Sequence, residues 1–224
     1  MNRSRRYIEL REKIDSGERE PLDALKAVKE AASAKFDESV DITVVLGVDP
    51  KKSDQMVRGS VVLPHGTGKK VRIAAVCEGK DAEDAKNAGA DLVGKDEIIK
   101  MVSKGQLDFD VLVAVPDSMK ELARFGKVLG PRGLMPSPKS GTVSKNIAET
   151  VKKVKQGQID YKMDKNAVVH TMIGKCSFPA ENLEDNFNRF MDSVRKSRPS
   201  SAKGKYIKKV TVSSTMGPSV TVAL

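Results

Sequence analysis

Two kinds of strand pattern divide this sequence and limit the folds open to it. In residues 39–46, Val40, Ile42, Val44 and Leu46 share one face, while the polar residues Ser39, Asp41 and Thr43 share the other. This alternation predicts an antiparallel strand with one face on a core and the other in water. Residues 71–76 and 111–115 are instead almost continuously apolar, which is typical of strands buried on both faces of a parallel sheet.

The middle of the chain has the strand–helix rhythm that a parallel sheet requires. A further helix is predicted after Ser144, a candidate N-cap, and ends at Gly157. We therefore expect an α/β unit with a parallel, Rossmann-like sheet. Its earlier strands are predicted over 71–77, 91–93 and 110–115, and its earlier helices over about 81–88, 95–103 and 117–124.

The two ends of the chain share an α+β pattern. The first has a helix from Pro21. The second has a helix with an apolar stripe from Leu183 to Val194. Their strands are predicted near 39–46 and 58–64 in the first end, and near 158–163, 166–172 and 205–213 in the second.

Neither end is expected to close a core alone, so the two are predicted to share one. Residues 1–66 and 159–224 would form a discontinuous α+β domain, split βαβ-like with an antiparallel sheet. Residues 67–158 would form the inserted α/β domain. The chain crosses between the domains twice, and the glycines at these crossings, Gly66, Gly68 and Gly157, are the predicted hinge.

Residues 125–143 have neither a helix period nor a strand period, and they contain several prolines, glycines and basic side chains. Fixed proline φ angles and permissive glycines predict an ordered loop without secondary structure of its own. A loop of this length inside a domain is usually functional or disordered. Arg132 and Lys139 are therefore candidate phosphate contacts, and the alternative is ordinary solvated surface.

The charge balance favours a polyanionic partner. Forty Lys and Arg stand against thirty Asp and Glu, a formal net charge of +10. Aromatic residues are 4% of the chain with no Trp, too few for stacking platforms, so the expected target is a folded RNA. No apolar run is long enough to span a membrane, and residues 1–6 include three arginines instead of an apolar signal core, which predicts a cytoplasmic protein without a membrane partner.

Catalytic and cofactor chemistry is not indicated. His65, His170, Cys77 and Cys176 form no close ligand pair, so neither a metal site nor a disulfide is expected. Residues 66–70, Gly-Thr-Gly-Lys-Lys, lack the first glycine and the Ser or Thr of a P-loop. No dinucleotide fingerprint follows the first buried strand. We expect no cofactor.

Two short segments carry residues suited to RNA contact. Residues 213–219 offer the hydroxyls of Ser214 and Thr215, backbone donors near Gly217 and the apolar side chain of Met216. Small hydroxyls and bare backbone can enter an RNA minor groove. The alternative is a bulge that ends an edge strand. Phe36 is either a core residue at a helix end or an exposed apolar contact.

Five segments in a fixed order closely resemble the bacterial large-subunit ribosomal protein L1 family. They are residues 35–38, 46–50, 58–66, 129–136 and 215–219, and the resemblance covers nearly the whole chain. It implies a two-domain protein on the mobile side stalk of large-subunit rRNA, beside the exit site. There the family assists movement and release of deacylated tRNA, and it represses translation by binding its own operon mRNA.

The resemblance also implies a site. The family's Thr-Met-Gly triad corresponds to Thr215, Met216 and Gly217, its Lys-Phe pair to Lys35 and Phe36, and the hydroxyl residue three beyond that Phe to Ser39. We therefore predict a non-enzymatic binder of folded rRNA, monomeric off the ribosome, with these residues and Ser214 at the RNA surface. The alternatives are a nucleotide-binding enzyme that uses the central sheet and a nonspecific basic chaperone.

Overall fold

The computed structural model describes residues 4–14 and 17–223, and the chain forms two compact units. Unit 1 consists of Met1–Gly68 and Ile159–Leu224, and unit 2 consists of Lys69–Gln158. Cys77 is a buried free thiol, and Cys176 is a partly buried one. No helix in the described ranges is apolar over a length that could cross a bilayer.

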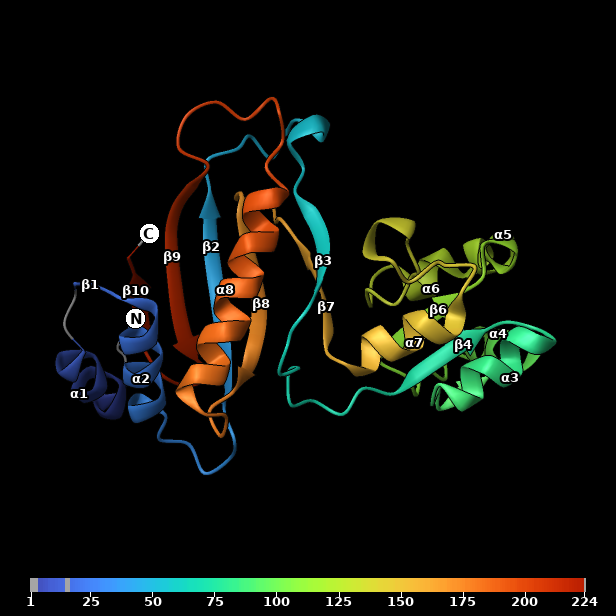
Figure 1. The fold of residues 1–224 in the computed structure, drawn as a ribbon, viewed down its shortest axis with the longest axis horizontal. Coiled ribbons are helices and arrows are strands. Elements are labelled where there is room, and N and C mark those ends of the chain that lie inside the picture. The colour runs from blue at the N-terminus through green and yellow to red at the C-terminus, as the bar shows by residue number, and fades with distance from the viewer. Residues whose placement is uncertain (1–3, 15–16, 224) are drawn as a thin grey trace. The chain divides into compact units, whose positions relative to one another are not determined.

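Unit 1 is built on a sheet whose described strands run in the order β1-β10-β9-β2-β8 (Figure 1). β2 (Ser39–Leu46) is antiparallel to β9 (Ile207–Ser214) on one side and to β8 (Val168–Lys175) on the other. The alternation predicted for β2 is confirmed, because Val40, Ile42, Val44 and Leu46 are at most 2% exposed and the residues between them are only partly buried. β9 continues through a turn into antiparallel β10 (Ser219–Val222), which pairs in parallel with β1 (Glu18–Arg19).

The sequence-based account of the C-terminal strands was incomplete. It predicted one final strand near 205–213, whereas the structure has a hairpin of β9 and β10. The alternative of a bulge at the end of an edge strand is wrong, since β9 lies between β10 and β2. The candidate segment around Thr215 is therefore the turn of a hairpin inside the sheet.

Helices α2 (Pro21–Ala31) and α8 (Ala180–Lys196) cover one face of this sheet (Figure 1). Pro21 is the first helical residue of α2, as predicted, because its missing N–H is not needed there. Leu25 and Phe190 are fully buried in the shared core, to which both chain segments of unit 1 contribute. Helix α1 (Arg5–Lys13), β1 and β10 were not predicted.

A second sheet of unit 1 pairs β3 (Arg58–Val62) with β7 (Gln158–Lys162), and a short 3₁₀ helix, η1 (Ser53–Gln55), precedes it. Tyr161 lies on β7 and is 2% exposed, edge-on to the ring of Phe190 with centroids 5.4 Å apart. Its hydroxyl lies 2.9 Å from the Ser193 Oγ and 2.7 Å from the Ser197 Oγ. This contact joins the smaller sheet to α8.

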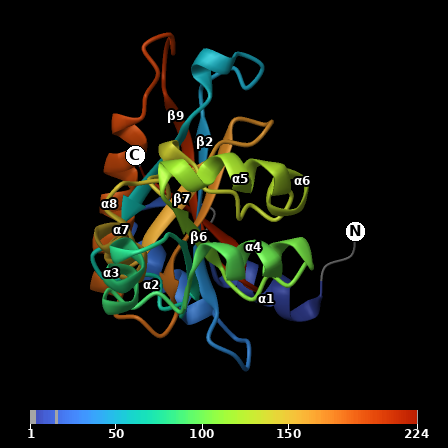
Figure 2. The same cartoon turned by 90° about the vertical axis from the view of Figure 1, so that its right-hand side faces the viewer.

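Unit 2 contains a parallel sheet in the order β5-β4-β6, covered by helices on both faces (Figure 2). On β4 (Ile73–Val76), Ile73 and Ala75 face helices α3 (Lys80–Asn87) and α7 (Ile147–Lys155). Ala74 and Val76 face the opposite cluster, to which α4 (Lys95–Ser103), α5 (Met119–Leu122) and α6 (Gly126–Leu129) contribute. The prediction that this strand is buried on both faces is confirmed. The two strands beside it are β5 (Leu92–Val93) and β6 (Val111–Ala114).

Several boundaries in unit 2 differ from the predictions. Asn146, not Ser144, caps α7: its side chain accepts from the Glu149 N–H, and the Ser144 Oγ accepts from the Asn146 N–H instead. The helix predicted over 117–124 is broken, because 3₁₀ turns η2 (Pro116–Ser118) and η3 (Ala123–Phe125) flank the single turn of α5.

The prediction that residues 125–143 contain no secondary structure is also wrong. They include α6 and the 3₁₀ turn η4 (Pro138–Ser140). Leu129 of α6 is fully buried, and burial in the core stabilises a helical turn that local sequence would not hold. Residues 137–142 are held together by hydroxyls, since Thr142 Oγ1 accepts from the Ser137 N–H at 2.9 Å and lies 3.0 Å from the Ser140 Oγ.

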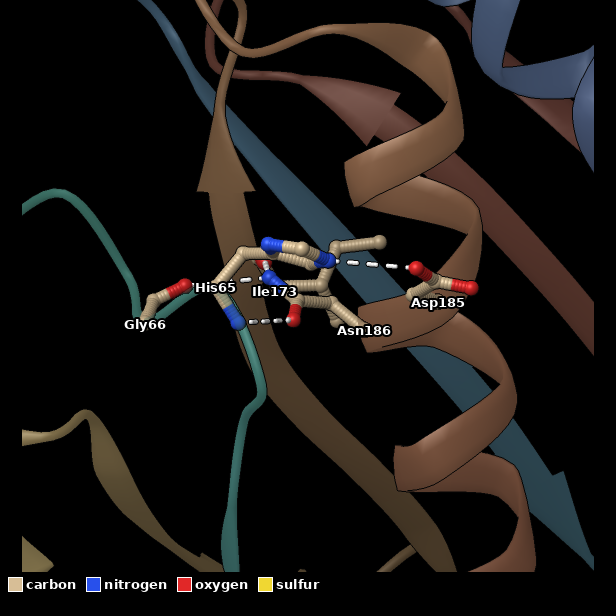
Figure 3. A network of polar contacts seen from close by, with 5 residues as sticks. All are labelled: His65, Gly66, Ile173, Asp185 and Asn186. Carbon is tan, nitrogen blue, oxygen red and sulfur yellow. Dashed lines mark hydrogen bonds and ion pairs between the residues drawn. The ribbon is translucent and has the colours of Figure 1, made fainter.

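Each predicted hinge glycine has a positive φ: 65° at Gly66, 72° at Gly68 and 100° at Gly157. Figure 3 shows how the first crossing is fastened to unit 1. Asn186 of α8 is fully buried, and its amide donates to the carbonyls of Gly66 at 3.0 Å and Ile173 at 2.8 Å. Its Oδ1 accepts from the His65 N–H at 3.2 Å, so the backbone of residues 65–66 is held by one side chain.

Candidate nucleic-acid interface

The β9–β10 turn, residues 215–218, lies against the first residue of β2. The Thr215 N–H donates to the Ser39 carbonyl at 3.1 Å, and the Ser39 N–H donates to the Thr215 Oγ1 at 3.0 Å. The register of β2 and β9 brings them together, because Val40 pairs with Ser214. Two predicted site residues that are 176 positions apart in sequence thus share reciprocal hydrogen bonds.

Two large apolar side chains are exposed next to these contacts. Met216, in the turn, is 49% exposed, and Phe36, in the segment before β2, is 55% exposed. The alternative that Phe36 is a core residue is therefore wrong. Lys35, beside it, is also exposed, as is Thr215. Exposed apolar side chains of this size can mark a binding surface.

Glu38 joins the segment that carries Phe36 to the turn. One oxygen of its carboxylate, Oε1, accepts from the Ala34 N–H at 2.9 Å, and the other, Oε2, accepts from the Met216 N–H at 2.9 Å. The residue is 1% exposed. Sequence reasoning missed this role, because a glutamate beside Phe36 carries no signal of its partner far along the chain.

The pKa of Glu38 reflects this environment. Burial alone would raise the pKa of the carboxyl, but hydrogen bonds from the backbone N–H groups of Met216 and Ala34 outweigh burial and hold it below its usual value. The carboxylate is therefore ionised at neutral pH. Its charge is stabilised by two backbone N–H groups, one in the turn and one in the segment before β2, rather than by a cation.

Gly217 fits the turn because of what lies beneath it. A Cβ at this position would lie 2.5 Å from the Ser214 Oγ, closer than side-chain atoms approach. Ser214 is 4% exposed, so this predicted RNA-binding residue lies under the turn rather than on its surface. A direct RNA contact of Ser214 stays a prediction, and a buried side chain is an unfavourable place for it. Ser214 contributes to the shape of the turn.

The structure also adds a basic residue that the sequence did not indicate. The Arg6 Nη2 of α1 donates to the Met216 carbonyl at 3.4 Å. Arg6 could not be placed from the sequence, because α1 was not predicted. We call Lys35, Phe36, Ser39, Thr215, Met216 and Gly217 the turn surface, with Arg6 at its margin.

The secondary candidates belong to unit 2. Arg132 is exposed, while the side chain of Lys139 lies outside what the structure describes. Neither is part of the turn surface of unit 1. Among the described residues, no three His, Cys, Asp or Glu side chains gather as they would around a metal ion.

Comparison with known proteins decides the family. A sequence profile of the Ribosomal protein L1p/L10e family matches residues 28–218. The chain belongs to this family. The resemblance drawn from the five sequence segments is confirmed, and the chain is a ribosomal protein rather than an enzyme.

Relatives of the family align along almost the entire chain. "Large ribosomal subunit protein uL1" of Laribacter hongkongensis is 52% identical over 220 residues, 98% of this chain and 94% of that protein. The protein of the same name from Chromobacterium violaceum is 53% identical over 215 residues, 96% and 93% of the two chains. That from Vibrio vulnificus is 51% identical over 220 residues, 98% and 94%.

Proposed function

We propose that this chain is a structural protein of the large ribosomal subunit, works in the cytoplasm on the ribosome, and binds the rRNA of the mobile side stalk through the turn surface. The observation that carries the proposal is the arrangement around Thr215. Residues from three parts of unit 1 meet there, with Met216 and Phe36 exposed on hydrogen-bonded backbone. The relatives are large-subunit proteins by name.

The chemistry of this surface suits folded RNA. Thr215 and Ser39 supply hydroxyls, and Met216 and Phe36 supply apolar contacts that can pack on ribose in a shallow minor groove. A net charge of +10 adds an attraction to phosphate that does not depend on sequence and that salt weakens. Affinity would come largely from charge, and selection of the site from the turn surface.

Further functions are proposed from the family resemblance. Unit 1 would be the RNA-binding domain and unit 2 the inserted α/β domain, with the hinge at Gly66, Gly68 and Gly157. The chain would assist movement and release of deacylated tRNA at the exit site and repress its own operon by binding a similar structure in the mRNA. It would be a monomer off the ribosome. Arg132 and Lys139 stay secondary RNA candidates.

The experiment compares two methionines of the same exposure. Met216 and Met56 are each 49% exposed in unit 1, but Met56 lies beside η1, outside the turn surface. Met216→Ala should weaken binding to a side-stalk rRNA fragment by more than about 1 kcal/mol, roughly fivefold, whereas Met56→Ala should change it little. Equal effects of the two substitutions would remove Met216 from the contact set.

Competition extends the test to the mRNA. If one surface binds both RNAs, the operator mRNA should displace the rRNA fragment completely, and Met216→Ala should weaken both complexes. Simultaneous binding of both would refute a shared site. Saturable binding of free nucleotides by the chain would instead favour the alternative that unit 2 is a nucleotide-binding domain.

A further inference from the structure

We propose that Glu38 is a positioning residue for the turn surface: its buried carboxylate holds the Phe36 segment and the β9–β10 turn in the geometry that RNA recognition requires. The inference rests on the proposed function of this surface. Its basis is that one carboxylate accepts hydrogen bonds from two segments. Oε1 accepts from the Ala34 N–H and Oε2 accepts from the Met216 N–H, each at 2.9 Å.

The surroundings of Glu38 favour a role in geometry. A buried carboxylate is costly unless hydrogen bonds or a cation compensate it. Within the described part of the chain, Glu38 takes part in no ion pair, so hydrogen bonds compensate its charge. Its own carbonyl accepts from the Cys176 N–H at 2.8 Å, which fixes the residue to the end of β8. The side chain therefore extends from an anchored backbone.

The hydrogen bonds of the turn define what it can offer to RNA. The Thr215 N–H is bound to the Ser39 carbonyl, the Met216 N–H to Glu38, and the Gly217 N–H to the Ser214 carbonyl at 3.3 Å. These three N–H groups are used inside the protein, so they do not form an anion-binding nest for phosphate. The turn presents side chains and carbonyls instead, and their directions depend on the internal bonds.

The direction of the change in RNA affinity distinguishes a positioning role of Glu38 from a purely electrostatic effect of its charge. A negative charge beneath a surface that binds a polyanion opposes binding, so removing the charge alone would strengthen the complex. If Glu38 positions the turn, removing it weakens the complex. The two ideas predict opposite changes in affinity.

The decisive variant is Glu38→Gln, with Asp37→Asn as the matched control. Glutamine has almost the same size, but its Nε2 is a donor and leaves one of the two backbone N–H groups without an acceptor. Asp37 is the neighbouring carboxylate and accepts from the Ser177 N–H at 3.1 Å and the Ser177 Oγ at 2.9 Å. Asparagine can keep both contacts, since the hydroxyl can also accept, so the control changes charge alone.

Binding to the side-stalk rRNA fragment is measured across salt concentrations. Glu38→Gln should weaken binding about tenfold, the scale of one hydrogen bond to a charged group, with an unchanged salt dependence because no phosphate contact is lost. Asp37→Asn should bind as tightly as the unmodified chain or slightly more tightly. Equal or stronger binding by Glu38→Gln would overturn the proposal.

Amide hydrogen exchange and a double-mutant cycle distinguish positioning from general destabilisation. In Glu38→Gln the Met216 amide should exchange faster while the Val212 amide inside β9 keeps its protection. In a Met216→Ala background, Glu38→Gln should cost distinctly less affinity, because the side chain it positions is gone. Full additivity of the two losses would overturn the proposal.

A second variant covers the case in which Glu38→Gln does not fold. Glu38→Asp keeps the charge but is one methylene shorter, so it cannot span both amides, and it should also weaken RNA binding. If Met216→Ala weakens binding and neither Glu38 variant does, positioning by Glu38 fails and the proposed function stands. If Met216→Ala and Met56→Ala both bind as the unmodified chain does, the proposed contact set itself fails.

Discussion

Replacing Gly217 with alanine tests whether the glycine is required by the protein or by the RNA. The added Cβ would lie 2.5 Å from the Ser214 Oγ, 3.7 Å from the Ser214 Cβ and 3.9 Å from the Ala31 carbonyl oxygen. Only the first distance is a clash. Ser214 is 4% exposed, so its hydroxyl has little room to move, and overpacking of this kind costs about 1–3 kcal/mol.

The cost can be measured in unit 1 alone. The chain has no Trp and three Tyr, at positions 7, 161 and 206, which all belong to unit 1. Tyrosine fluorescence during urea unfolding therefore reports this unit. With a urea m-value of about 1–3 kcal/mol/M, Gly217→Ala should lower the unfolding midpoint by roughly 1 M.

A rescue experiment identifies the atom responsible. Ser214→Ala removes the Oγ and leaves a Cβ at an ordinary contact distance, so Gly217→Ala should cost less than about 0.5 kcal/mol in that background. The same cost in both backgrounds would refute the reasoning. If the double variant regains stability but not RNA affinity, the glycine is required for approach of the RNA.

Two other substitutions probe buried hydrogen bonds of unit 1. Asn186→Ala would remove the side-chain partner of three backbone groups, two at the first crossing and the Ile173 carbonyl in β8, and should lower the free energy of unfolding by about 3–5 kcal/mol. Asn188→Ala, at an exposed position of the same helix, serves as control and should cost under about 0.5 kcal/mol. A loss below about 1 kcal/mol for Asn186→Ala would contradict the role of Asn186 in holding the crossing. Because the pKa of Glu38 is lowered in the folded state, its carboxylate stabilises unit 1 above about pH 4.5, and this contribution is lost as the pH falls through the lowered value. As the pH falls below about 4.5, the urea unfolding midpoint should fall less steeply for Glu38→Gln than for the unmodified chain. The same pH dependence in both proteins would contradict the lowered pKa of Glu38.

Local patterns were sufficient for the strands and helices with a buried face. The alternation of β2 and the continuous apolar run of β4 each predicted both the type of strand and its burial, because side chains in a strand point alternately to its two faces. Helix α4 was predicted with the bounds the structure gives, residues 95–103. Short elements were missed where burial of a residue such as Leu129, rather than a repeating pattern, holds them.

The turn surface marks the boundary between what sequence and tertiary structure determine. By itself the sequence determined the family, the strand patterns and the candidate segments around Phe36 and Thr215, since these depend on residue order and local period. Only the tertiary structure decided that Phe36 is exposed, that Ser214 is buried, and that Glu38 and Arg6 reach the turn. Those contacts join residues that are distant along the chain, and strand register, which brings them together, is not encoded in any one segment.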